Sequence, residues 1–425
     1  MGTSTLTDTN LQSDTQSTKD KVFKIVTLCV PVLMGILIFF NPMPHTTAIK
    51  EICFYGSVII VLILIYFKRV KFSLKSPLTL PFALFTAWVF IGIFFALDRE
   101  NSIHDFISHL LKYIVMYFII INFFNSRKRL VGLSWVIIIS AAIFSIGEIF
   151  YFYYMLGNSF STKLVTGLSE IPVNWVGYIT VSAIIFASHQ IFIRESSLSV
   201  KTISFVALFP LFSLSLLTQT RSTLIALFLS IVVLFYKKKK IMIFFVGILV
   251  IFTTMSPVKD RFLHTNLITS LRLDIHATTL EIIKDFAVMG IGFGMETYRN
   301  DDVINLETYN KKVPEKYRQP AIHNDPHSML PSIAVRAGLV GLVLFLCILF
   351  TSCRMCWSCI RHGKDDFIRN WGSCIAGVLV VVFVIGIFEP FFSHAPEVLF
   401  YLVLGMITIL WQFNQGVSSK LNNFP

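Results

Sequence analysis

Two arginines and two histidines in this chain have the side-chain chemistry of a diphosphate site beside a reacting hydroxyl. Arg221 stands in the stretch TQTRS, Arg272 is the second residue of LRLDIHATTLEIIKDF, and His323 and His327 belong to AIHNDPH. A guanidinium group offers a fixed fork of hydrogen-bond donors that suits phosphate, and it stays charged at neutral pH. A histidine with an ordinary pKa near ~6.5 can take a proton from a hydroxyl. This combination predicts chemistry in which a hydroxyl attacks while a diphosphate leaves.

The composition predicts that these residues are positioned by membrane helices. Hydrophobic residues make up 55% of the 425 residues, and charged residues make up 14%. A soluble chain of this length needs more polar surface than that. The apolar runs are continuous over roughly 17–25 residues, which suits helices that cross a bilayer, whereas a β-barrel would show short alternating segments. We therefore expect an all-α polytopic integral membrane protein.

Twelve apolar runs are candidates for transmembrane helices. They cover residues 23–40, 51–67, 79–97, 107–124, 131–155, 173–193, 202–218, 222–236, 241–255, 329–352, 371–388 and 397–413. Residues 1–22 are rich in Ser, Thr, Asp and Gln, and we expect a disordered cytoplasmic tail there rather than a cleaved signal peptide. The predicted organisation is this tail, nine helices in 23–255, a large loop in 256–328, three helices in 329–413 and a second tail in 414–425.

The basic residues predict which side each connection faces. Connections rich in lysine and arginine alternate with connections that are poor in them; the rich ones hold Lys68, Arg69, Lys71 and Lys75, then Arg127, Lys128 and Arg129, then Arg194 and Lys201, then Lys237 to Lys240, then Arg354, Arg361, Lys364 and Arg369. Such connections stay in the cytoplasm, so both termini are predicted to be cytoplasmic and the 256–328 loop to be outside. This asymmetry and attraction to anionic membrane lipids explain the net charge of +12, and no nucleic-acid partner is needed.

The large outer loop has structure signals of its own. The spacing of Leu273, Leu280, Ile283 and Phe286 predicts a helix, which ends at a cluster of three glycines at 290, 292 and 294. The following stretch, INLETYNKKVPEKYRQPAIHNDPH, is polar and carries three prolines, and we expect it to be loop.

Taken one at a time, the candidate site residues have simpler explanations. Arg221 can extend to phospholipid headgroups, Arg272 can face water, and His327 can lie at the membrane interface. The predicted topology, however, puts all three on one membrane surface around a single loop. We therefore expect Arg221 and Arg272 to bind a lipid diphosphate sugar and His327 to activate the acceptor hydroxyl. Accessory candidates are His323 and, from the last outer loop FEPFFSHAPE, Glu389 with His394, for which loop packing is the alternative.

The seven cysteines do not predict a metal site. None lies in the large outer loop, so no disulfide framework is expected there. CRMCWSC has the spacing C-x2-C-x2-C, but a metal site usually wants four ligands, and the nearest histidine, His362, follows the last cysteine by three residues. Interfacial or lipid-modified thiols are the simpler interpretation. We expect no metal and no cofactor.

Three stretches resemble segments of a known family. TQTRS at 218–222, before an apolar run, resembles an arginine at the outer end of a helix; SLRLDIHATTLEIIKDFAVMGIGFG at 270–294 resembles an arginine-led helix with a glycine turn; HSMLPSIAVRAGLVG at 327–341 resembles a histidine followed eleven residues later by a glycine. Together they resemble the O-antigen ligase family, within the superfamily of O-antigen ligases and polymerases. By this spacing His327 is the equivalent histidine and Gly338 the equivalent glycine. The chain departs from the family pattern at four positions: Ser328 stands where Asn is frequent, Arg336 where Glu is common, His276 where an aromatic residue is frequent, and Ala287 where Pro is usual.

The resemblance implies a GT-C-like fold and a metal-independent inverting glycosyltransferase. It implies transfer of a polysaccharide from undecaprenyl diphosphate to lipid A–core, at the periplasmic face of the bacterial inner membrane, in lipopolysaccharide biosynthesis. Arg221 and Arg272 would hold the diphosphate, and His327 would act at the acceptor hydroxyl. Metal independence fits the outer loops, which contain no Asp-x-Asp pair and no tight carboxylate cluster.

Three other functions remain open at this point. A protein-glycosylating relative is disfavoured, because the outer loop shows no added domain that could hold a protein acceptor. An O-antigen polymerase would use the same donor with a second lipid-linked glycan as acceptor, and the histidine pattern before the tenth span favours the ligase. A lipid or glycan transporter would place ionisable groups near the bilayer midplane and show repeated halves. Charges within the spans are sparse here, and the single large loop argues against a repeat.

Overall fold

Helices form the regular structure of the residues that the structure describes. The computed structural model describes residues 5–165, 167–168, 171–193, 196–255, 272–392 and 396–416, with the backbone alone for residues 5–20, 248–249, 252–255 and 396. Within these ranges no residue lies in a strand. Nine of the helices described there are long and apolar enough to cross a membrane. The prediction of an all-α polytopic membrane protein is therefore confirmed.

The order of helices follows the predicted apolar runs. The first part of the chain forms α1 (Thr5–Phe40), α2 (Thr47–Tyr66), α3 (Thr79–Ile93), α4 (Arg99–Asp105), the π-helical turn η1 (Phe106–Leu111), α5 (Lys112–Phe123), α6 (Arg127–Ile149), a second π-helical turn η2 (Phe150–Met155), α7 (Val173–Phe192), α8 (Leu198–Leu217), α9 (Arg221–Phe235) and α10 (Lys239–Met255). Then come α13 (Leu273–Asp285), α14 (Glu296–Arg299), α15 (Leu306–Lys312), the 3-10 turn η3 (Glu315–Tyr317), α16 (Met329–His362), α17 (Asp366–Gly386) and α18 (Pro396–Gln415). Each predicted run falls on a helix, but α3, α9 and α10 have 15, 15 and 17 residues, at or below the usual length of a span. The number of twelve spans stays a prediction.

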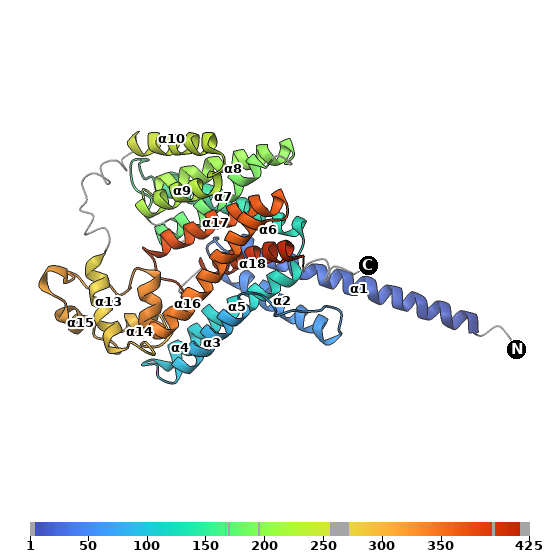
Figure 1. Ribbon diagram of the computed structural model, residues 1–425, viewed down its shortest axis with the longest axis horizontal. Helices are drawn as coiled ribbons and strands as arrows, with labels where there is room; N and C mark the ends of the chain where they lie inside the picture. The colour runs from blue at the N-terminus through green and yellow to red at the C-terminus, as the bar shows by residue number, and fades with distance from the viewer. Residues whose placement is uncertain are drawn as a thin grey trace.

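The centre of the bundle is built from the later helices. α7 is buried along one continuous stretch, from Trp175 to Gln190, and packs against α6, α8, α9 and α17. α16 crosses the bundle against α3, α17 and α18 (Figure 1). Since α7 and α17 are covered by neighbours, the residues at their outer ends are held by packing on several sides.

The described part of the large loop forms a small unit at one end of the bundle (Figure 1). Its own apolar cluster includes Ile282, Ile291 and Tyr298, and it packs against Val335 of α16. The predicted helix after Arg272 is confirmed as α13. The prediction of loop over the later polar stretch is wrong for α15, because the Asn305 carboxamide accepts a 2.9 Å hydrogen bond from the Thr308 N–H and so caps a short helix.

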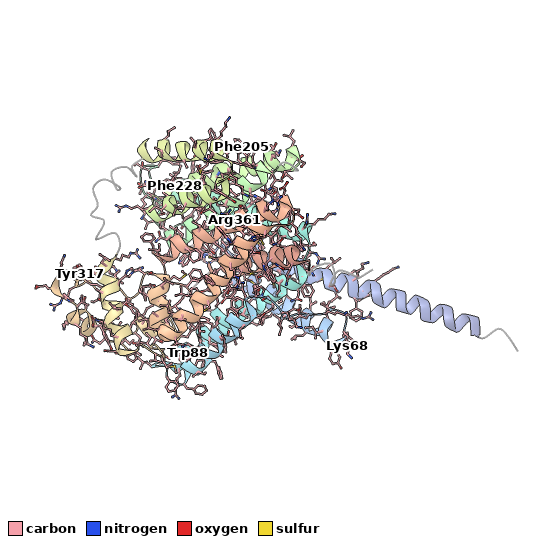
Figure 2. The ribbon with its side chains drawn as sticks, in the orientation of Figure 1. Lys68, Trp88, Phe205, Phe228, Tyr317 and Arg361 are labelled. Carbon is pink, nitrogen blue, oxygen red and sulfur yellow. The ribbon has the colours of Figure 1, made fainter. Side chains whose placement is uncertain are left out.

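Two connections that are predicted to face the same side of the membrane lie together in the structure. Figure 2 shows Lys68, from a connection predicted to be cytoplasmic, and Tyr317, from the large loop, at opposite ends of the bundle. At the Lys68 end, Arg127 forms an ion pair with Asp365 and thereby joins two connections that share a predicted side. The grouping of connections therefore agrees with the predicted topology, while the compartment that each end faces stays a prediction.

The N-terminal segment differs from the expectation. α1 begins at Thr5, so the described residues of the expected disordered tail are helical, and this part of α1 extends away from the bundle (Figure 1). Once a transmembrane helix is nucleated, each further residue adds a hydrogen bond without a new nucleation cost.

A pair of glycines joins the loop unit to α16. Gly338 has φ 70° and breaks the regular course of α16, and Gly290 has φ 72° in the turn after α13. The two segments exchange backbone hydrogen bonds: the Ile291 N–H donates to the Val335 carbonyl at 2.8 Å, and the Leu339 N–H donates to the Ala287 carbonyl at 2.7 Å. A Cβ at Gly338 would lie 1.9 Å from the Val288 carbonyl oxygen. Both the left-handed backbone and the close approach therefore require glycine.

Candidate active site

Arg221 begins the short helix α9. The connection from α8 is tight, because Gln219 takes a left-handed conformation with φ 47°, and the Leu164 N–H fastens it by donating to the Leu217 carbonyl at 3.1 Å. Arg221 is half-buried. The first turn of a helix presents free N–H groups and a partial positive charge, so the start of α9 and the guanidinium favour an anion at the same place.

A chain of hydrogen bonds leads from α9 to Glu389. The Ser222 hydroxyl donates to the Asn174 side-chain carbonyl at 2.7 Å, and the Asn174 amide donates to the Glu389 carboxylate at 2.6 Å. These three residues come from α9, from the start of α7 and from the connection after α17. The residue next to Arg221 is thereby tied to the last outer loop, a relation that the sequence analysis did not predict.

Arg272 contacts the loop that carries Glu389. Its guanidinium donates a 3.0 Å hydrogen bond to the carbonyl of Phe388, the residue before Glu389. Arg272 also lies close enough to Glu389, His276 and His327 to influence the pKa of each. Arg272 therefore acts on Glu389 through its charge. Arg221 is related to Glu389 through its chain neighbour Ser222, which is hydrogen-bonded to Asn174.

His327 is a neutral imidazole in this cluster. Burial and then the charge of Arg272 lower its pKa to about 4, and Asp325 opposes that change. The Asp325 carboxylate accepts a 2.8 Å hydrogen bond from the His327 backbone N–H, while the Nδ1 atom of His327 is buried without a hydrogen-bond partner in the structure. The ring of His323 lies 5.7 Å away by centroids, at 74°, and His323 is exposed. His327 can therefore accept a proton or a hydrogen bond at neutral pH.

Glu389 titrates near neutral pH. Burial raises its pKa to about 7, against the lowering effects of the Asn174 hydrogen bond and the charge of Arg272. The side chain is buried, with 8% of the residue exposed. Both the protonated and the ionised form of Glu389 are therefore populated at neutral pH. His394 lies outside the described residues.

Backbone conformations of high energy gather around these residues. Six non-glycine residues of the described chain have positive φ, and four of them are Gln219, Arg272, His327 and Phe392. For ordinary residues this conformation costs of the order of 1–3 kcal/mol, and it persists where the surrounding structure imposes it, often at functional sites. The strain supports the grouping of these segments into one site.

Arg336 is a positioning residue that the sequence analysis noted as a departure and did not explain. It is 1% exposed and forms a 3.2 Å ion pair with Asp105. Its guanidinium also donates to the Phe293 carbonyl at 2.6 Å and to the Phe391 and Phe392 carbonyls at 3.0 and 3.1 Å. Arg336 therefore joins the glycine turn to the loop that carries Glu389. A cation inside a span is costly, and this cost was the signal in the sequence that it must have partners.

Comparison with known proteins agrees with the motifs. Residues 205–346 match the family model described as O-antigen ligase, and this segment contains Arg221, Arg272, His323 and His327, while Glu389 lies beyond it. A comparison with curated proteins finds no match. The family implies a glycosyltransferase-like enzyme with lipid-linked polysaccharide substrates in a membrane, and it covers ligases and polymerases alike. The resemblance seen in the three motifs is confirmed over residues 205–346, where this multi-pass membrane chain matches the family described as O-antigen ligase.

Proposed function

We propose that the chain is an O-antigen ligase, a metal-independent inverting glycosyltransferase. Its donor would be a polysaccharide on undecaprenyl diphosphate, its acceptor lipid A–core, and its place the periplasmic face of the bacterial inner membrane. The observation that carries this proposal is the position of Arg272, whose charge acts on both Glu389 and the neutral His327. Hydrogen bonds link Glu389 through Asn174 to Ser222, the residue after Arg221.

The two arginines hold the donor diphosphate. Diphosphate oxygens accept hydrogen bonds from the guanidinium groups of Arg221 and Arg272, each worth about 1.5–3 kcal/mol. As the bond between sugar C1 and the diphosphate oxygen breaks, its electron pair goes to the departing diphosphate. Fixed positive charges stabilise that growing negative charge without reorganising.

His327 receives the proton. The acceptor hydroxyl oxygen attacks C1 from the face opposite the leaving group, a new C1–O bond forms, and the hydroxyl proton passes to a ring nitrogen of His327. In the free protein burial and then the charge of Arg272 lower the pKa of this ring. A bound diphosphate offsets the charge of Arg272, and an opposite charge nearby raises the pKa of an imidazole. His327 is therefore a stronger base when the donor is in place.

An apolar groove supports a lipid-linked donor. The groove, of about 1200 Å³, lies between α6 and α8, with Ile139 and Ile143 on one wall and Phe205 and Phe209 on the other. Figure 2 shows Phe205 on α8. The groove includes Leu217, the last residue of α8, and so ends close in the chain to Arg221. A polyprenyl chain in this groove would present its diphosphate at the start of α9.

The test is a transfer assay with purified chain, undecaprenyl diphosphate-linked glycan and lipid A–core, with and without EDTA. We expect glycan on lipid A–core, in equal amounts in both samples. Elongated lipid-linked glycan with no product on lipid A–core would assign the polymerase reaction instead. Movement of the donor across proteoliposomes without a new glycosidic bond would assign transport.

A further inference from the structure

A second polar cavity lies apart from the Arg221, Arg272 and His327 cluster. It has a volume of about 330 Å³ and is lined by residues of α1, α2, η1, α5 and α18, with Lys50, Glu51, His109 and Lys112 among them. α18 begins at Pro396, directly after the outer loop that carries Glu389, so the cavity opens at the same end of the bundle as the candidate active site.

The charges in this cavity leave a net positive balance. Lys112 forms an ion pair with Glu51, and its side chain is 15% exposed. Lys50 lies close enough to interact electrostatically with both of them. The two remaining titratable side chains of the lining, His109 and Tyr113, both contact the buried Glu397, and the Nδ1 atom of His109 lies 3.0 Å from its carboxylate oxygen. Two ammonium groups thus share the single carboxylate of Glu51.

The unbalanced charge favours an anion. Two ammonium groups in a half-buried space repel each other, and a charge removed from water is costly unless it is compensated. A phosphate group between Lys50 and Lys112 would compensate it and accept charge-assisted hydrogen bonds from both.

The other walls indicate where the phosphate comes from. Leu37, Phe54, Met116 and Val398 line the same cavity. A free phosphate ion gains nothing from apolar walls, whereas a phospholipid brings its phosphate and its apolar chains together. We propose that this cavity binds the phosphate headgroup of an anionic lipid, from the leaflet that faces the active site.

The experiment is an equilibrium titration of the purified full chain in neutral detergent. The probe is dihexanoyl phosphatidic acid; dihexanoylglycerol and inorganic phosphate separate the contributions of chains and phosphate. We expect phosphatidic acid to bind at least about tenfold more tightly than either, and Lys50→Gln to weaken its binding about 10- to 100-fold, as loss of a charge-assisted hydrogen bond predicts. The matched control is Lys311→Gln in the large loop, where the lysine is 72% exposed, and it should change binding by less than about twofold.

Three results would overturn the inference. They are equal binding of dihexanoylglycerol, equal binding of inorganic phosphate, and unchanged binding of phosphatidic acid to Lys50→Gln. The comparison of the three probes on the unaltered chain decides the question even if the variant does not fold. Because the readout is lipid binding and Lys50 has no part in the proposed transfer, the result is independent of whether the chain is a ligase.

Discussion

The Asn174 amide donates a 2.6 Å hydrogen bond to the Glu389 carboxylate, and the Asn174 carbonyl oxygen accepts one from Ser222. This relationship joins the helix that begins with Arg221 to the loop that Arg272 holds through the Phe388 carbonyl. The carboxyl group in this network, Glu389, has a pKa of about 7 and lies near Arg272, one of the two arginines that we propose as ligands of the diphosphate. The charge of the site therefore depends on pH in the neutral range.

The first prediction concerns donor affinity and Glu389. Above pH 7 the Glu389 carboxylate is negative and repels a diphosphate, so donor affinity should fall about tenfold between pH 6 and pH 8. Glu389→Gln stays neutral, so its affinity should remain near the wild-type value at pH 6 over the whole range. A binding titration with lipid-linked donor at several pH values measures this. Glu307→Gln, at an exposed position of α15, is the control and should follow the wild type.

The same group makes stability depend on pH. A carboxyl whose pKa rises on folding from 4.5 to about 7 contributes stability that is complete below about pH 4.5 and is lost as the pH rises through about 7. The melting temperature of the wild type should therefore fall relative to that of Glu389→Gln between pH 5 and pH 8. The same dependence of melting temperature on pH in the two proteins would contradict a raised pKa at Glu389.

The second prediction concerns the guanidinium groups. Lysine keeps the charge of arginine but loses its planar fork, so Arg221→Lys and Arg272→Lys should each weaken donor binding by about 10- to 100-fold. Both are measured by titration with lipid-linked donor. Arg318→Lys is the control, because Arg318 is exposed and donates to carbonyls of its own loop. Full donor affinity in both site variants would remove the arginines from the diphosphate site.

The third prediction concerns the buried ion pair of Arg336 and Asp105. Arg336→Met removes the buried arginine that compensates Asp105 and leaves only His104 and His109 beside the carboxylate, so it should lower the free energy of unfolding by about 3–5 kcal/mol. Adding Asp105→Asn removes that charge and should restore part of the loss, while the asparagine oxygen still accepts the 2.8 Å bond from the Met295 N–H. Unfolding of the single and double variants in detergent measures the coupling. Losses that simply add would contradict a direct interaction.

The sequence predicts the parts of this molecule that depend on local pattern. Runs of apolar residues predict the helices because a bilayer leaves no other partner for the backbone. The spacing that begins at Leu273 predicts α13, and the glycine cluster predicts its end. The tail before Val22 and the stretch around Leu306 were predicted less well, because helix extension and a single Asn cap outweigh a polar composition there.

The candidate site was predictable in its residue types and not in its connections. Arg221, Arg272 and His327 stand out because charged groups near membrane spans need a reason. Asn174 and Ser222 carry no such signal, since both are ordinary polar residues near helix ends. Their role depends on a contact between α7, α9 and the loop after α17, which is set by tertiary packing. Arg336 had a signal, its charge within a span, but its partners come from three distant segments.

The measurement that tests the central claim most directly separates donor binding from transfer in His327→Ala. If His327 accepts the hydroxyl proton, the variant should bind lipid-linked donor within about threefold of wild type and lose at least about 100-fold in transfer to lipid A–core. His323→Ala, at the exposed neighbouring histidine, should retain transfer within about threefold. Full transfer by His327→Ala, or equal losses of binding and transfer, would contradict the role proposed for His327.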